Sequence, residues 1–398
     1  MRIKKRKFIT FYAYLMVLWI MLSSEAIYAH VYPWWDNTFK ILVVLFGIGS
    51  IAWLRVEQAK KLIVYFTMLS IILLLWTIGG ATVVHVLTIL AKLVPIIFFC
   101  CAMKNKNVDL IRIVYSTIYY LVVLSLIFFI LFDLNLLGIA PTRYIWELDN
   151  GYQYIYTNYL GIYFRWHRTR SVLGINMISA NGIWHEPGAY QIYANLGLFF
   201  ALFTYSSEKK SKCKAVVFTL AVISSTSTMG LLLMAVLYFI HFGKKISIWK
   251  IIVIIIAGCL VTIFSVFLLA EKMGTANWLD RTGNWAKGFS YILKSPIFGY
   301  DIGNAPLYSG FLSYFVLFGI LGCYPVFVFL KGVWKRNVFG QRSIDKIAIS
   351  AWYILSMMNE NYAYFSVIFL IYGICTFFVG NGNSTRPHDC LWRISETA

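Results

Sequence analysis

The sequence predicts an all-α polytopic membrane protein, and its composition carries that prediction. Of its 398 residues, 60% are hydrophobic and only 13% are charged, and the mean hydropathy is +0.72. A soluble protein of this length needs a far more polar surface, so lipid must cover much of the chain. The composition therefore excludes a soluble enzyme. The 35 Lys and Arg residues outnumber 16 Asp and Glu, but apolar runs separate them, so they do not indicate a nucleic-acid-binding protein.

Apolar runs long enough to cross about 30 Å of hydrocarbon define the expected helices in chain order. The runs that each predict one span are 8–27, 38–54, 62–79, 81–103, 108–137, 189–206, 251–270 and 309–330. Two longer stretches, 215–242 and 347–380, are interrupted by polar residues at 224–228 and 359–361, and both have basic flanks. Because basic flanks favour the cytoplasmic side, each stretch is expected to form a hairpin of two short helices with an outer polar tip.

These spans give about 12 transmembrane helices in a single integral membrane domain, 1–398, with both termini in the cytoplasm. The cysteines all fall in spans or on the inner side, so no disulfide framework is expected. The start of the chain also fits a signal peptide ending near Ala26, whose removal would not alter the remaining topology. Two large outer loops remain, 138–188 and 271–308, and the functional residues are expected there.

The first outer loop is dense in aromatic residues. Tyr152, Tyr156, Tyr159 and Tyr163 are spaced i, i+4, i+7 and i+11, which predicts one face of a helix lying along the membrane surface. Two interpretations of the aromatic residues stay open, an interfacial anchor and a stacking platform for sugar rings. Trp166 and Trp184 of the same loop are further candidates for substrate binding.

The same loop contains arginines and no lysine. They are Arg143, Arg165, Arg168 and Arg170. A guanidinium group can bind two phosphate oxygens at once, so this bias suggests an anionic group bound outside. Chance combined with lipid-phosphate contact explains the bias equally well.

The first outer loop ends in residues 182–188, GIWHEPG, directly before a span. Pro187 fits the first turn of a helix and pushes Glu186 into an extended conformation. The Glu186 carboxylate would then lie at the positive end of the helix dipole, as a simple acidic cap or as a catalytic group. His167, His185 and Glu186 lack the spacing of a metal site, so no metal is expected.

Three segments together resemble a known family. Residues 182–188 resemble the G-x-[FW]-x-E-P motif of Wzy-type O-antigen and capsular polysaccharide polymerases, whose superfamily includes the O-antigen ligases. Residues 225–230, STSTMG, resemble the Ser/Thr-rich stretch of that family. Arg281, Trp285 and 295–304, SPIFGYDIGN, which ends at Asn304, resemble its second outer loop. Many relatives carry an arginine shortly before the first motif, and here 178–180 holds none.

The resemblance implies a glycosyltransferase at the outer face of the bacterial cytoplasmic membrane. Such a polymerase transfers a growing glycan from its polyprenyl-pyrophosphate carrier onto the next lipid-linked repeat unit. Glu186 or His185 would accept the proton of the attacking hydroxyl. Arg281, with Arg168 or Arg170, would neutralise the leaving pyrophosphate. The expected partners are the lipid-linked oligosaccharide, membrane lipid, and assembly proteins such as a flippase and a chain-length regulator, with no cofactor and no nucleic acid.

Two charged residues within the predicted spans are further candidates for the site. Lys92 lies mid-span with His85 and Thr88 on the same helix face, where an ion without a partner costs about 3 kcal/mol. It is expected to face the protein interior, as part of an ion pair, a site for carrier pyrophosphate or an ion relay. Glu360, in the last hairpin, is a candidate acidic partner or alternative base.

Two other functions stay open. An O-antigen-ligase-like transferase would use the same donor with another acceptor. An exporter or flippase for lipid-linked saccharides would concentrate polar residues at mid-membrane, and Lys92 is the main feature in its favour.

Overall fold

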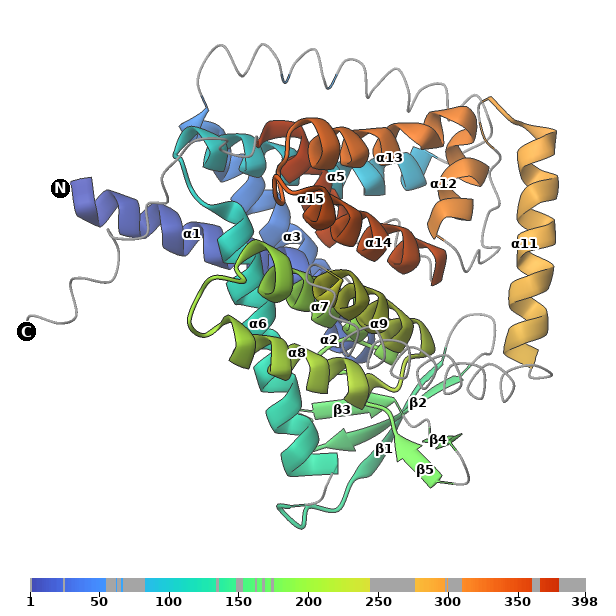
Figure 1. Ribbon diagram of the computed structural model, residues 1–398. Helices are drawn as coiled ribbons and strands as arrows, with labels where there is room; N and C mark the ends of the chain where they lie inside the picture. The colour runs from blue at the N-terminus through green and yellow to red at the C-terminus, as the bar shows by residue number, and fades with distance from the viewer. Residues whose placement is uncertain are drawn as a thin grey trace, which may run out of the picture.

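The computed structural model describes most of the chain. The described residues are 2–23, 26–54, 62, 66, 83–133, 136–147, 153–161, 163–166, 169–172, 175–243, 276–297, 299, 310–359 and 366–378. Within them the protein is mainly helical, and a small group of strands lies at one end of the helices (Figure 1). The all-α prediction therefore holds for the bundle and fails for the first outer loop.

Helices follow the predicted apolar runs wherever those runs are described. They are α1 (Arg2–Leu22), α2 (Ile27–Val31), α3 (Pro33–Gly49), α5 (Val83–Asn105), α6 (Leu110–Phe128), α7 (Pro187–Phe199), α8 (Ser211–Ser225), α9 (Thr228–Phe242), α11 (Ala276–Lys294), α12 (Gly310–Phe318), α13 (Cys323–Leu330), α14 (Ser343–Asn359) and α15 (Ser366–Phe377). Short 3-10 or π-helical turns are η1 (Ser50–Trp53), η2 (Phe129–Asp133), η3 (Phe200–Thr204), η4 (Gly319–Gly322) and η5 (Lys331–Lys335). The predicted spans 62–79 and 251–270 lie outside the described residues, apart from Leu62 and Phe66.

Both interrupted stretches contain two helices, as predicted. In the first, α8 ends at Ser225, and Thr226 adopts a left-handed conformation with φ of 48°. Ser227 then caps α9, because its hydroxyl accepts a hydrogen bond from the Gly230 N–H at 3.4 Å. In the second, α14 and α15 are separate helices, and the predicted tip at Glu360 lies outside the described residues.

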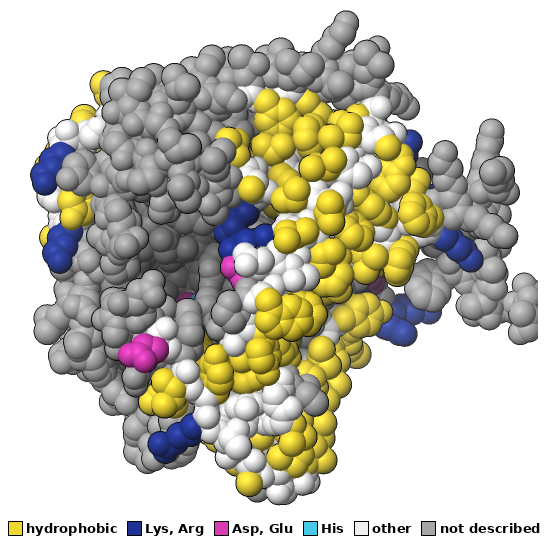
Figure 2. Space-filling model, turned by 180° about the vertical axis from the view of Figure 1, so that it is seen from behind, with side chains coloured by type: hydrophobic (Ala, Val, Ile, Leu, Met, Phe, Trp, Pro, Cys, Tyr) yellow, Lys and Arg dark blue, Asp and Glu magenta, His cyan; other side chains and the backbone are white. Residues whose placement is uncertain are grey.

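Apolar side chains cover the outside of several helices as well as their packed side. Exposed residues recur at i, i+4 and i+7 on α3 (Ile41, Leu45, Ile48), α6 (Tyr120, Leu124, Ile127) and α8 (Val216, Leu220, Ile223). Figure 2 shows a face on which hydrophobic side chains predominate among the described residues. A helix that is apolar all round and still exposed is typical of contact with lipid.

Two of the described helices are long and apolar enough to cross a membrane. They are Trp34–Trp53 and Leu110–Asp133. The helices Thr228–Phe242 and Ser366–Phe377 are apolar but shorter. The count of about 12 spans, with both termini inside, stays a prediction.

The first and the last of the described helices, α1 and α15, pack against each other. α1 contacts α3, α6 and α15, and it buries Ala13, Met16, Val17 and Ile20 completely. At the end of α1, the Ser23 hydroxyl donates to the Ser366 hydroxyl at 3.0 Å. The helix that also fits a signal peptide is thus part of the bundle core.

The first outer loop forms strands in place of the predicted surface helix. β1 (Thr142–Glu147), β2 (Gln153–Tyr159) and β3 (Tyr163–Trp166) make an antiparallel sheet in the order β1-β2-β3. β4 (Thr169–Val172) and β5 (Ile175–Ile178) form a separate antiparallel pair. The helix prediction is wrong because this segment is rich in Tyr, Ile and Thr, which favour strands.

The sheet lies between two helical elements. On one face, Tyr156 and Phe164 pack against Ile27 and Val31 of α2. On the other, Tyr159 and Tyr163 pack against Phe132, just beyond the end of α6. Figure 1 shows the strands gathered at this end of α6. The sheet is therefore fixed to the bundle on both faces.

Candidate functional site

The segment before α7 meets the tip of the α8–α9 hairpin. The Ala180 N–H donates to the Ser224 carbonyl at 2.8 Å. The hydroxyls of Ser179 and Thr226 are also hydrogen-bonded to each other, and both residues are buried. The residues that lead into 182–188 thus contact the hairpin tip that contains 225–230.

Glycine is required at two positions around this contact. Gly182 has φ of 61°, and a Cβ there would come within 2.8 Å of the Ser125 hydroxyl and 2.9 Å of the Tyr190 ring. On α9, a Cβ at Gly230 would come within 2.8 Å of Gln191 Cβ. These glycines allow the loop to approach α6 and α9 to approach α7.

Three predicted sugar-stacking residues lie in the protein interior. Trp184 is completely buried and stacks on Tyr193, with ring centroids 4.3 Å apart. Tyr156 and Tyr159 are also buried and pack against α2 and Phe132 respectively. The structure corrects the expectation that these rings bind sugar, because protein atoms already cover their faces. They act as anchors for the loop and the sheet.

Glu186 is the N-cap residue of α7, as the sequence predicted. Its φ and ψ of −142° and 156° are extended, and Pro187 begins the helix. Its carbonyl accepts the Tyr190 N–H at 3.2 Å, while its side chain makes no capping hydrogen bond. The carboxylate is therefore not committed to closing its own helix.

His185 and Glu186 lie together at the surface of this site. Their side chains are 13% and 17% exposed, and His185 Nε2 lies 3.9 Å from Glu186 Oε1. This distance is too long for a hydrogen bond between these two atoms. Both side chains are mostly buried but still partly exposed to solvent.

One of the four loop arginines is committed to an internal ion pair. Arg165 Nε lies 2.7 Å from Asp133 Oδ1, and the two side chains are 7% and 0% exposed. The Tyr163 hydroxyl donates to Asp133 Oδ2 at 2.9 Å. Burial, and then the Asp133 charge, raise the pKa of the Tyr163 phenol well above its ordinary value, which keeps this donor protonated. Sequence reasoning missed this pair because its partners come from different predicted elements.

The remaining predicted site residues are placed only in part. Arg170 lies on β4 opposite Met177, and Trp166 ends β3, but neither side chain belongs to the described part. Arg281 and Trp285 lie one turn apart on α11, which stands at the edge of the bundle (Figure 1). The Trp285 ring packs with the α12 cluster around Leu312, whereas the Arg281 side chain is not described. Tyr152, Arg168, Asn304 and Glu360 lie outside the described residues.

Lys92 is half-buried on α5. It shares a helix face with Ile96 and Phe99, which are completely buried, and α5 packs against α3 and α15. This placement agrees with the expectation that Lys92 faces the interior.

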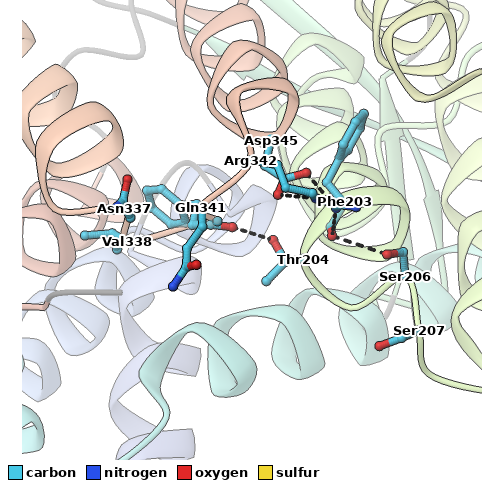
Figure 3. A pocket seen from close by; sticks show the side chains of 11 residues that line it. Phe203, Thr204, Ser206, Ser207, Asn337, Val338, Gln341, Arg342 and Asp345 are labelled. Atoms are coloured by element: carbon cyan, nitrogen blue, oxygen red, sulfur yellow. Dashed lines mark hydrogen bonds and ion pairs between the residues drawn. The ribbon is translucent and has the colours of Figure 1, made fainter. Parts of the chain in front are cut away.

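A pocket of about 420 Å³ lies at the other end of α7, where η3 meets the loop before α14 (Figure 3). Arg342 on its wall donates to Asp345 through Nε at 2.9 Å and Nη2 at 2.7 Å, and to the Phe203 carbonyl at 3.1 Å. The Thr204 hydroxyl donates to the Phe339 carbonyl at 3.1 Å. These contacts hold helix ends together and neutralise the charge on the wall.

Within the part of the chain that the structure describes, no group of three or more His, Cys, Asp or Glu residues could hold a metal ion. Comparison with protein-family models and with curated proteins finds no match for the chain.

Proposed function

We propose that this protein is a Wzy-type polysaccharide polymerase, a multi-pass enzyme of the bacterial cytoplasmic membrane. In this proposal it transfers a polyprenyl-pyrophosphate-linked glycan onto the next lipid-linked repeat unit at the outer face of the membrane. Both termini lie in the cytoplasm, and the two outer loops, 138–188 and 271–308, carry the site. A flippase and a chain-length regulator would be its partners in the assembly pathway.

One observation carries the proposal. The residues just before 182–188 contact the Ser/Thr-rich segment 225–230 and its flank, through Ala180 to Ser224 and Ser179 to Thr226, and both segments resemble polymerase motifs. The exposed apolar stripes and the long apolar helices support a membrane location. A partly exposed carboxylate at a helix start, next to a histidine, is a suitable group for proton transfer.

The proposed step is a single glycosyl transfer. A hydroxyl oxygen of the acceptor sugar attacks the anomeric carbon of the donor glycan. The bond from that carbon to the pyrophosphate oxygen breaks, and the pyrophosphate leaves with the electron pair. Glu186 accepts the hydroxyl proton, and His185 beside it is the alternative base.

Positive charge assists the leaving group. The leaving pyrophosphate needs its negative charge neutralised rather than a proton donated to it. Arg281, with Arg168 or Arg170, would supply this positive charge from the outer loops. The activated donor already contains the energy of the new bond, so the reaction uses no nucleotide, metal or other cofactor.

The test is polymerisation by the purified full-length protein in lipid nanodiscs. The substrate is a lipid-pyrophosphate-linked repeat unit, with no nucleotide added, and gel electrophoresis reports a ladder of longer glycans. Glu186→Gln keeps the shape of the side chain and removes its basicity, so the rate should fall by about 10²-fold or more. Glu147→Gln, at an exposed site on β1, is the matched control and should retain wild-type activity.

Two outcomes would count against the proposed function, and a third would count only against Glu186 as the base. No ladder from any lipid-linked repeat unit would remove the polymerase function. Transfer to a lipid core or a protein, without chain growth, would indicate the ligase-like alternative. Normal chain growth by Glu186→Gln would move the base to His185 or Glu360.

A further inference from the structure

A single buried amide joins the loop before Glu186 to the outer sheet. Asn181 is completely buried, and its Nδ2 donates to the Phe164 carbonyl of β3 at 3.2 Å. The same nitrogen donates to the carbonyls of Gly182, at 3.4 Å, and Trp184. One side chain therefore fixes both the sheet and the backbone two residues before Glu186.

The sheet that receives this hydrogen bond is itself anchored to α6. Tyr163 and Arg165, the residues on either side of Phe164, both bind the Asp133 carboxylate at the end of η2. Arg165 Nη2 also reaches the Thr157 hydroxyl on β2 at 3.4 Å. The position of Phe164 is thus set by an ion pair next to it on the strand.

The far side of the loop is tied to the N-terminal segment. The Ile27 N–H donates to the Ile183 carbonyl at 2.9 Å, and Ala26 forms a β-bridge with Trp184. These bonds fix the loop against the start of α2, which also packs on the sheet. Asn181 completes the arrangement by connecting the loop with β3.

We propose that Asn181 is a positioning residue for Glu186. The Asp133–Arg165 pair keeps β3, which accepts the Asn181 hydrogen bond at Phe164, in place. The inference rests on the proposed function, because it assigns Asn181 a role through the base. Asn181 does not touch substrate; it sets where the carboxylate stands relative to the outer sheet. A misplacement of about 1 Å in such a group can lower a rate by about 10²-fold.

The experiment measures kcat and KM of the purified full-length protein in nanodiscs with the lipid-linked repeat unit. Asn181→Ala removes all three donated hydrogen bonds and should lower kcat by about 10-fold to 10²-fold. KM should stay within about twofold, because substrate contacts are unchanged. Asn181→Ser keeps one shorter donor and should recover part of the lost kcat.

The matched control is Asn158→Ala in the same outer sheet. Asn158 also makes side-chain hydrogen bonds, to the Gly161 N–H at 2.8 Å and to the Thr142 hydroxyl at 3.1 Å, but it has no bond to the Glu186 loop. Its loss should leave kcat within about twofold of wild type. If kcat depended only on the stability of the sheet, both variants would lose kcat to the same extent.

A second substitution tests the anchoring of β3 to Asp133. Tyr163→Phe removes one hydroxyl from Asp133 and should lower kcat less than Asn181→Ala. Combined with Asn181→Ala it should add little, because both act through the same carbonyl of Phe164. If the two losses of kcat instead multiply in the double variant, Tyr163 and Asn181 act independently, and the link through Phe164 is refuted.

The failure of this inference differs from the failure of the proposed function. Wild-type kcat in Asn181→Ser and Asn181→Ala, with a Glu186→Gln variant that is inactive, would overturn the positioning role alone. If Asn181→Ala does not accumulate in the membrane, Asn181→Ser decides, and a wild-type kcat in that variant overturns the inference. An inactive wild type would instead overturn the polymerase function.

Discussion

The two ends of the continuous α7–η3 helix hold their polar groups in different ways. At the start, a neutral amide, Asn181, fixes the loop through backbone carbonyls, and Glu186 stays 3.9 Å from its histidine neighbour. At the end, Arg342 is paired with Asp345 at 2.7 Å and also holds the Phe203 carbonyl. The charges at the far end are neutralised at hydrogen-bond distance.

This difference separates stabilising from reactive arrangements. At the far end, Arg342 joins Asp345 of α14 to the Phe203 carbonyl of η3, so the ion pair holds two elements together. At the start, hydrogen bonds of Asn181 and of the Ile183 carbonyl place the backbone that leads to Glu186. The comparison predicts that substitutions at the start of α7 change activity, whereas substitutions at its end change stability.

The largest expected effect is an all-or-none difference in cysteine labelling. It tests whether the two ends of the α7–η3 helix face opposite sides of the membrane. In a cysteine-free background, Leu160→Cys, in the highly exposed turn after β2, should react with an impermeant maleimide added to intact cells. The native Cys213, exposed near the start of α8 and kept as the only cysteine, should react only after permeabilisation. Labelling of both residues from outside would contradict the proposed topology.

A second prediction contrasts two arginines. Arg281→Ala should lower polymerisation by about 10²-fold or more at normal protein level, and Arg281→Lys should retain part of the activity as a point charge. Arg342→Ala should lower the thermal unfolding midpoint, because Asp345 loses its partner, while the rate per folded molecule stays near wild type. Arg143→Ala, in the outer sheet but away from the motifs, is the control for loss of an outer charge. Equal rates in wild type and Arg281→Ala would leave Arg168 and Arg170 as candidates.

A third prediction concerns the glycine at the start of the motif loop. Gly182 and Gly138 have the same φ of 61°. A Cβ added at Gly138 would have no atom within 4 Å, whereas a Cβ added at Gly182 would overlap with Ser125 and Tyr190. Gly138→Ala should therefore lower the free energy of unfolding only by the strain of the left-handed conformation, about 1–2 kcal/mol. Gly182→Ala adds steric overlap worth about 1–3 kcal/mol more. Thermal unfolding in detergent should show the larger loss for Gly182→Ala, and equal losses would refute the packing argument.

The smallest expected effect is at the far end of the helix. Thr204→Val removes the hydrogen bond to the Phe339 carbonyl and should lower the free energy of unfolding by about 1 kcal/mol. Polymerisation per folded molecule should be unchanged. A clear loss of activity in this variant would break the contrast between the two ends.

The sequence predicted those features that depend on local chemistry. Pro187 fixed the start of α7 and the extended conformation of Glu186, and the polar residues at 224–228 marked the break between α8 and α9. These predictions succeeded because proline geometry and helix capping act over only a few residues.

The features that failed depend on tertiary contacts. The tyrosine spacing fitted a helix, yet Tyr156 and Tyr159 belong to a strand that α2 and Phe132 cover on its two faces. The hydrogen bond from Asn181 to the Phe164 carbonyl spans 17 residues and has no local pattern. Of the two interpretations that the sequence left open for these tyrosines, burial favours an anchor over a sugar-stacking surface.

The contact between the first and last helices has a consequence for how the molecule is made. Ser23 and Ser366, which are hydrogen-bonded, are 343 residues apart in the chain. At about 5–20 residues per second, α1 would enter the membrane about 20–70 s before α15 is synthesised. During that interval the interior face of α1 lacks its final neighbour and must remain covered by lipid, by earlier helices or by the insertion machinery. The contact between α1 and α15 can therefore form only after α15 has been made, and a chain that stops before α15 leaves this face of α1 without that neighbour.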